Sequence, residues 1–201
     1  MQMQIREYRK QDFQPLKAII RNTWHYDEFS CLTNYTFSQV AVLDGTAVGI
    51  ILVKNIKAHR CALSARFQQI LSIVKLYASK EGRAVSQIFQ NVNEIDQQLL
   101  RGCKKTYPAE LALFAVSSSC QGKGIGKKLF HSALAYLKQQ GLDEFYLFTD
   151  TSCNYGFYEH QGMSRRGEKE HLFQINGQTA KMNFFLYDRA TAFHGAAGYD
   201  F

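Results

Sequence analysis

The spacing of hydrophobic and polar positions predicts short strands and amphipathic helices that follow one another along the chain. Strands are predicted at residues 4–8, 40–43 and 46–53, and Asp44-Gly45 between the last two is a strong signal for a two-residue hairpin. Apolar residues at helical spacing follow Asp12, which can cap that helix. The first part of the chain is therefore predicted to fold as β-α-β-β.

A second run of elements follows after an insertion at residues 57–106. Residues 110–116 are nearly all apolar, which is typical of a strand in the centre of a sheet. A helix is predicted over residues 127–140 and ends at Gly141. The other predicted elements are a strand over 144–149, a short helix over 154–160, and a hairpin of strands 165–175 and 178–187 around Asn176-Gly177. This order predicts a mixed α/β sheet.

The most informative segment is Gln121-Gly122-Lys123-Gly124-Ile125-Gly126, which lies between a predicted strand and a predicted helix. Such a turn favours an anion, because backbone N–H groups point outward and the helix dipole is positive there. A P-loop is excluded, since Gln121 and Lys128 stand where it needs glycine and a hydroxyl. The dinucleotide fingerprint is excluded too, because its third glycine would fall at Lys127. The turn is predicted to hold another phosphate-bearing cofactor.

Two linked motifs resemble those of a known family. Val116 with residues 121–129 is similar to the acetyl-CoA signature of the GNAT N-acetyltransferases, which often has Val-x-Pro-x-x-Arg/Gln-Gly-x-Gly-x-Gly/Ala. Residues 154–163 resemble the family's Phe-Tyr-Glu-x-x-Gly-Phe helix. Ser118 stands where Pro is common, and Met163 where Phe is common. Two motifs at the right separation are more specific than either alone.

The resemblance implies both a fold and an activity. The fold would be α/β (α+β), with a GNAT-like mixed, mostly antiparallel central sheet flanked by helices. Residues 1–190 would form a single acetyltransferase domain and residues 191–201 a C-terminal tail. The activity would be transfer of an acetyl group from acetyl-CoA, as co-substrate, to a primary amine of a small molecule or peptide.

Two residues are candidates for the acid–base chemistry that this activity needs. A lysine-type amine has a pKa near ~10.4 and must lose a proton before it attacks. Glu110 matches the base of histone-acetylating members, in their Ala/Thr-Glu-Ile-Val-Phe-Cys-Ala strand, and is the candidate general base, directly or through water. By resemblance, the Tyr158 hydroxyl faces the coenzyme sulfur as general acid, with Tyr155 as a weaker rival. Alternatively, Glu110 is an exposed strand-end carboxylate and Tyr158 a core residue.

The residues expected to bind the cofactor also follow from the resemblance. The backbone of Val116 and Ser118 is expected to pair with pantetheine, and Asn154 to hydrogen-bond the same arm. Alternating glycines would let the backbone approach the pyrophosphate closely. The pyrophosphate set is Gln121, Gly122, Lys123, Gly124, Ile125, Gly126 and Lys127.

The insertion at residues 57–106 contains two amphipathic patterns. One comprises Phe67, Ile70, Leu71 and Val74, and the other Val85, Ile88, Phe89, Val92, Ile95 and Leu99. Gly82 is predicted to separate two helices. The helical pair could form a wall of the acceptor pocket, a homodimer surface or a simple lid.

Charge and cysteine content test other classes of function. The net charge of +7 suits an anionic partner, but no base-reading motif accompanies the basic window at residues 54–83, so nucleic acid is not favoured. Five cysteines without Cys-x-x-Cys spacing or a secretion signal indicate reduced thiols and a cytoplasmic location. A cysteine nucleophile with a histidine partner lacks any signature. No metal is expected from the scattered histidines, and no apolar run could span a membrane.

Two alternatives to an acetyltransferase stay open at the level of sequence. One is a catalytically silent acyl-CoA-binding or sensor protein on the same fold. The other is a basic nucleic-acid-binding module, whose binding would weaken steeply with salt. The residues name no particular amine acceptor.

Overall fold

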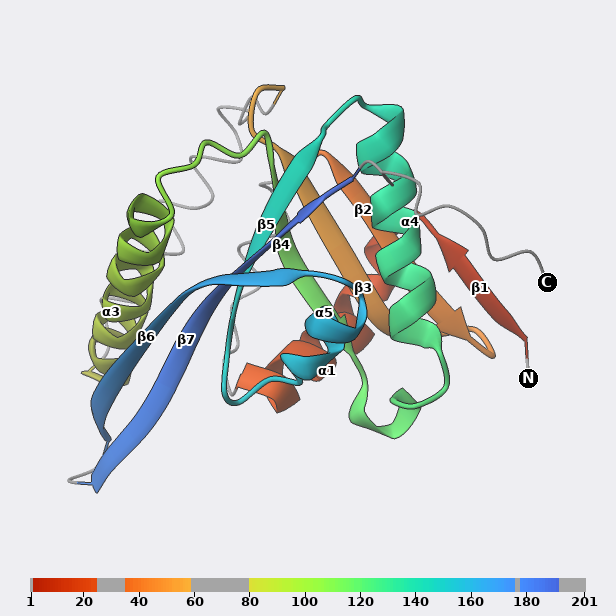
Figure 1. The fold of residues 1–201 in the computed structure, drawn as a ribbon. Helices are drawn as coiled ribbons and strands as arrows, with labels where there is room; N and C mark the ends of the chain where they lie inside the picture. The colour runs from red at the N-terminus through yellow and green to blue at the C-terminus, as the bar shows by residue number, and fades with distance from the viewer. Residues whose placement is uncertain (1, 25–34, 59–79, 176–177, 192–201) are drawn as a thin grey trace.

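The computed structural model describes residues 2–24, 35–58, 80–175 and 178–191. Seven strands in this part of the chain form one sheet, in the order β1-β2-β3-β4-β5-β7-β6 (Figure 1). The strands are β1 (Met3–Arg6), β2 (Phe37–Leu43), β3 (Thr46–Asn55), β4 (Ala109–Val116), β5 (Glu144–Asp150), β6 (Ser164–Ile175) and β7 (Gln178–Ala190). Neighbouring strands are antiparallel except for the parallel pair β4–β5. The predicted mixed, mostly antiparallel sheet is confirmed.

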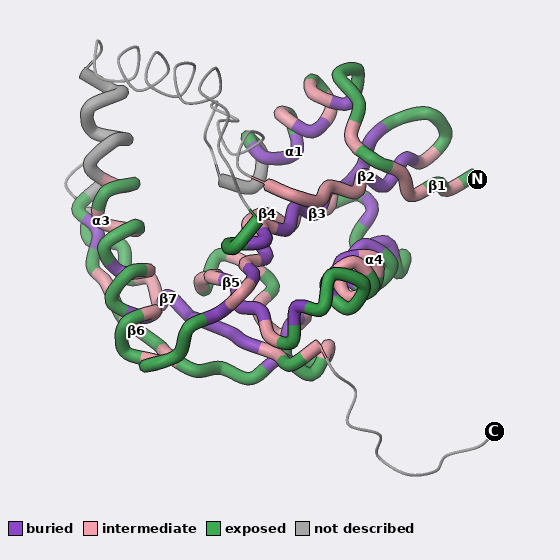
Figure 2. Tube along the Cα trace, turned by 90° about the horizontal axis from the view of Figure 1, so that it is seen from above, coloured by how far each residue is buried: buried purple, intermediate pink, exposed green. Residues whose placement is uncertain are grey.

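Helices cover both faces of this sheet (Figures 1 and 2). They are α1 (Phe13–Trp24), α3 (Lys80–Gly102), α4 (Ile125–Gln139) and α5 (Gly156–His160). Helices α4 and α5 share one core with the sheet, while α1 and α3 pack on the opposite face in two separate cores. The sheet is therefore the middle layer of three, and the face opposite α4 is divided between α1 and α3.

Turn chemistry sets several boundaries as the sequence predicts. Asp44 and Gly45 both have positive φ, +47° and +85°, as the tight hairpin between β2 and β3 requires. Helix α4 ends before Gly141, whose φ is +63°, and the Leu142 N–H donates to the Leu137 carbonyl at 3.0 Å. This is the usual glycine stop of a helix.

The structure refines two predictions at helix starts. Asp12 lies in a short 3-10 turn (Lys10–Asp12) before α1, where it accepts hydrogen bonds from the Arg9 N–H and, at 2.7 and 2.8 Å, from the Arg6 guanidinium. Asp12 therefore caps the turn that leads into α1 from its third position, in a capping box with Arg9, and ties this turn to β1. Helix α5 starts at Gly156, two residues later than predicted, so Asn154 and Tyr155 precede it.

Within the insertion, the described residues are 57–58 and 80–106. The predicted helix with Phe67 and Val74 lies outside the described residues. The second amphipathic pattern forms the helix α3, which runs from Lys80, so Gly82 lies inside this helix and does not separate two helices. Ile88, Val92, Ile95 and Leu99 pack in one cluster as predicted, but Phe89 is 44% exposed. Ile95 and Leu99 pack on Phe184 and Leu186 of β7, which fixes α3 to the far end of the sheet.

No helix in the described ranges is both long and apolar enough to cross a membrane.

Candidate active site

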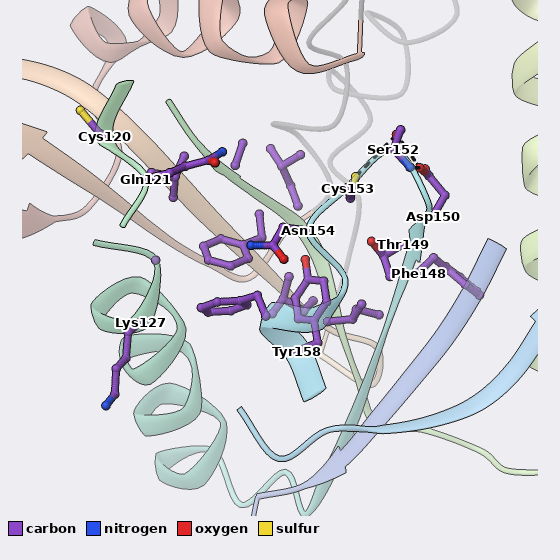
Figure 3. A pocket seen from close by; sticks show the side chains of 18 of the residues that line it. Cys120, Gln121, Lys127, Phe148, Thr149, Asp150, Ser152, Cys153, Asn154 and Tyr158 are labelled. Atoms are coloured by element: carbon purple, nitrogen blue, oxygen red, sulfur yellow. Dashed lines mark hydrogen bonds between the residues drawn. The ribbon is translucent and has the colours of Figure 1, made fainter. Parts of the chain in front are cut away.

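A cavity opens where the parallel strands β4 and β5 separate. The two strands pair only at Ala109–Phe145 and Glu110–Tyr146. The β3–β4 register shifts between Leu111 and Leu113, and such a bulge bends the strand that contains it. Beyond the bulge, a cavity of about 800 Å³ lies between the strands (Figure 3). It is lined by Leu111–Val116 of β4, Leu147–Asp150 of β5, and the segments that follow both strands.

The glycine-rich turn closes one end of this cavity. Gly122 and Gly124 have φ of +75° and +74°, a left-handed backbone that side chains rarely adopt. Gly124 is also the residue immediately before α4. Because the N–H groups in the first turn of a helix have no carbonyl partner within it, those of Ile125, Gly126 and Lys127 can bind an anion.

Tyr158 enters the cavity from α5. Figure 3 shows its hydroxyl pointing into the cavity beside the Asn154 side chain. The residue is 9% exposed and its ring packs among those of Phe114, Phe157 and Tyr187. Burial, which disfavours the charged tyrosinate, raises the pKa of Tyr158. The hydroxyl therefore stays protonated near neutral pH.

A hydrogen-bond network holds α5 in this position. The Tyr187 hydroxyl donates to Glu159 Oε1 at 2.6 Å, and the Arg165 guanidinium donates to the same oxygen at 2.8 Å. Arg165 also lies over the rings of Tyr155 and Phe185. Tyr155 does not line the cavity, so the geometry favours Tyr158 over this rival.

Glu110 lies where β4 and β5 begin to diverge. Its neighbours Ala109 and Leu111 belong to the core under α4, so strand alternation places the Glu110 side chain on the face that α1 and α3 share. In register, it stands between Lys54 of β3 and Tyr146 of β5. Burial raises the pKa of Glu110, against the opposing effects of the Lys54 charge and a hydrogen bond from Tyr146.

Comparison with known proteins decides the family. The model of the acetyltransferase (GNAT) family matches residues 2–163, most of the chain.

The chain belongs to the GNAT acetyltransferase family.

Solved GNAT-type structures share this fold at low sequence identity. An N-acetyltransferase from Staphylococcus aureus Mu50 matches with a TM-score of 0.58 and 12% identity, over 96% of this chain and 100% of that one. The ribosomal-protein-S18-alanine N-acetyltransferase from Escherichia coli matches with a TM-score of 0.57 and 10% identity, over 99% and 100%. Ard1 from Thermoplasma volcanium matches with a TM-score of 0.59 and 14% identity, over 94% of this chain and 98% of that one. No curated protein matches the sequence.

Most residues predicted to bind the GNAT cofactor line the cavity. They are Val116, Gln121, Gly122, Gly124, Gly126, Lys127 and Asn154. Ser118 and Lys123 are exposed and lie outside the lining, and Ile125 is buried in the core beneath α4. Ile125 can therefore serve an anion only through its backbone N–H.

Sequence reasoning missed two carboxylates near this GNAT site. Asp150, the last residue of β5, lines the cavity and accepts a hydrogen bond from the Ser152 N–H at 2.7 Å. Asp96 of α3 lies close enough to Glu110 and Asp150 for their charges to affect its pKa. A signal for Asp96 was present, because this polar residue interrupts the apolar stripe of Val92, Ile95 and Leu99.

Within the described part of the chain, no group of three His, Cys, Asp or Glu side chains is arranged to hold a metal ion.

Proposed function

We propose that this protein is an N-acetyltransferase that transfers the acetyl group of acetyl-CoA directly to a primary amine in a ternary complex. The observation that carries the proposal is the cavity between β4 and β5, which joins an anion-binding helix terminus to the Tyr158 hydroxyl. Glu110 lies at the closed end of the same opening. A cofactor with a diphosphate at one end and a reactive thioester at the other fits this arrangement.

In this proposal, the cofactor lies along the free edge of β4. The backbone of Val116 and Ser118 would pair with the pantetheine arm, and the Asn154 amide inside the cavity would hydrogen-bond it. The diphosphate would accept hydrogen bonds from N–H groups of residues 121–127. The exposed side chain of Lys123 adds positive charge beside them.

The acyl transfer then needs one proton acceptor and one donor. Glu110 takes a proton from the ammonium group, directly or through water, and the freed nitrogen forms a bond to the thioester carbonyl carbon. As the C–S bond breaks, negative charge develops on sulfur and the Tyr158 hydroxyl donates to it. Because burial raises its pKa, Tyr158 is always protonated for this step. Because the pKa of Glu110 is raised toward neutral pH, its carboxylate is a stronger base than an exposed one.

Replacing Tyr158 with Phe is expected to reduce kcat by about 10–100-fold, the usual cost of one hydrogen bond to a charged group. The KM for acetyl-CoA should change little, because the ring still fills its place among Phe114, Phe157 and Tyr187. Steady-state thiol release measures both constants. Tyr155→Phe is the matched control and should leave kcat unchanged, and an unchanged rate for Tyr158→Phe would refute the donor role.

Replacing Gly124 with Ala is expected to weaken coenzyme A binding by about tenfold or more. Its φ of +74° is strained for alanine by about 1–2 kcal/mol, although no atom lies within 4 Å of the added Cβ. The turn should therefore relax and move its N–H groups away from the diphosphate. Calorimetry with coenzyme A measures the effect. Gly102→Ala is the control, because this glycine lies in a helix and its surroundings are equally open. If Gly124→Ala and Gly102→Ala bound coenzyme A with equal affinity, that result would argue against the anion site.

The proposal as a whole is tested by incubating the protein with acetyl-CoA and a panel of primary amines. Free thiol together with a mass increase of one acetyl group on an amine is the expected result. Coenzyme A binding without thiol release from any amine would indicate an acyl-CoA sensor. Nucleic-acid binding that weakens steeply with salt and does not depend on acetyl-CoA would indicate a basic nucleic-acid-binding module.

A further inference from the structure

The insertion helix α3 brings an acidic side chain to the acceptor side of the site. The side chain of Glu110 lies on the sheet face that α1 and α3 share, opposite α4. An amine that approaches Glu110 from this face meets α3 on one side. Figure 2 shows α1 and α3 well apart on either side of β4 and β5.

The docking of α3 fixes the place of Asp96. Ile95 and Leu99 pack in one buried cluster with Tyr146 of β5, whose hydroxyl hydrogen-bonds the Glu110 carboxylate. Leu99 also lies against Gly167 of β6, where a Cβ would come within 3.0 Å of it, so the helix sits very close to the sheet. Asp96 lies one helical turn from Val92 and from Leu100, which both pack against the same cluster. It therefore lies on the Glu110 side of α3, near Tyr146.

The charges around Asp96 are mostly negative. The charges of Glu110 of β4 and Asp150 of β5 act on it, and β3 contributes Lys54, whose charge acts on Glu110. From β6, Lys169 hydrogen-bonds Gln98. Burial and then the charges of Glu110 and Asp150 raise the pKa of Asp96 to about 7. The neighbourhood is therefore acidic although the whole chain carries a net charge of +7.

We propose that Asp96 binds the acceptor, and that the acceptor carries a second cationic group besides the reacting amine, as a linear diamine or polyamine does. This inference rests on the proposed acetyltransferase function. Glu110 is occupied with the proton of the reacting ammonium, so it cannot also neutralise a second cation. Asp96 supplies the separate carboxylate, and it keeps its cation when the reacting nitrogen becomes a neutral amide. Acetyl transfer itself needs no atom of Asp96.

The experiment compares Asp96→Asn with wild type, using 1,5-diaminopentane and 1-aminopentane as acceptors. We expect the variant to raise the KM for the diamine by about tenfold, with kcat nearly unchanged, since one charge-assisted contact is lost. The KM for the monoamine should change less than about threefold. Glu94→Gln makes the same charge change at an exposed position of α3 and should affect neither amine.

A second readout is the pH dependence of the KM for the two amines. Asp96 binds a cation only as a carboxylate, and it loses its proton as the pH rises through about 7. The ratio of the diamine KM to the monoamine KM should therefore fall as the pH rises through this value in wild type and in Glu94→Gln, and it should not change with pH in Asp96→Asn. A purely structural role of Asp96 would not produce this dependence. A KM ratio that does not change with pH in wild type, or equal effects of Asp96→Asn on the two amines, would overturn the proposal.

The failure of this inference is distinct from the failure of the proposed function. If wild type is active and Asp96→Asn changes the KM for both amines equally, only the role of Asp96 is overturned. If wild type releases no thiol with any amine, the acetyltransferase proposal fails. Calorimetry of 1,5-diaminopentane with the coenzyme-A-loaded protein then still tests the contact between Asp96 and the second cation. Equal affinity of wild type and Asp96→Asn for the diamine would overturn that contact.

Discussion

Replacing Glu110 with Gln is expected to lower kcat/KM for the amine acceptor by about 10²–10⁴-fold, the range for loss of a general base. The amide can still accept the hydrogen bond from Tyr146, so β4 and β5 should keep their register. Coenzyme A affinity should be unchanged, because Glu110 does not line the cavity between the strands. Steady-state kinetics and calorimetry measure the two effects separately.

The pH dependence gives this prediction its sharpest form. Burial raises the pKa of Glu110, so the wild-type rate should fall as the pH drops through this raised value and the base becomes protonated. In the Gln variant that acid limb should disappear. Glu170→Gln is the matched control, since this carboxylate pairs with Lys181 on the exposed β6–β7 hairpin. Wild-type turnover by Glu110→Gln between about pH 6 and 9 would remove Glu110 from the base role.

Replacing Asp188 with Asn is expected to lower the free energy of unfolding by about 2–3 kcal/mol, through loss of hydrogen bonds to a charged group. Asp188 of β7 is 1% exposed and accepts from Tyr107 Oη and Lys105 Nζ at 2.9 Å and from Arg166 Nε at 2.7 Å. The Lys105 and Arg166 side chains are 37% and 47% exposed, so water can solvate them in the variant. The loss of unfolding free energy should therefore be smaller than for breaking a fully buried ion pair. The melting temperature should fall by about 5–10 °C.

The effect of Asp188 should fade in acid. Burial alone would raise the pKa of Asp188, but hydrogen bonds from Lys105, Arg166 and Tyr107 outweigh it and lower the pKa. The stabilisation is therefore complete above the unfolded value near ~3.9 and is lost as the pH falls through the folded value. Urea unfolding at neutral and acid pH measures it. Glu170→Gln should cost less than about 1 kcal/mol, and an Asp188→Asn effect independent of pH would contradict the ion-pair account.

Local signals in the sequence predicted the parts of the fold that depend on local chemistry. Asp44-Gly45 and Gly141 mark their turns because the backbone there needs positive φ, which few residues adopt readily. The glycine-rich turn was predictable for the same reason, since strand, turn and helix are consecutive in the chain. The cofactor residues predicted on this turn therefore fell largely on the cavity wall.

Contacts between distant segments could not be predicted in this way. Asp96 approaches Glu110 only because α3 docks on the sheet through Leu99 and Gly167, which are far apart in the sequence. The choice between Tyr155 and Tyr158 likewise depends on where α5 begins and on its tie to Tyr187. Periodicity gives a helix and its apolar face, but the neighbour of each polar residue on the edge of that face depends on tertiary packing.

The divergence of β4 and β5 also bears on how the protein behaves when empty. Two strand edges face each other across the cavity in the middle of the sheet, and within the described residues their pairing stops at Glu110 and Tyr146. Unpaired edges are the features through which sheets recruit foreign strands and aggregate. Bound thioester carrier would occupy these edges. A supply of acetyl donor would then protect the enzyme from self-association as well as feed its reaction.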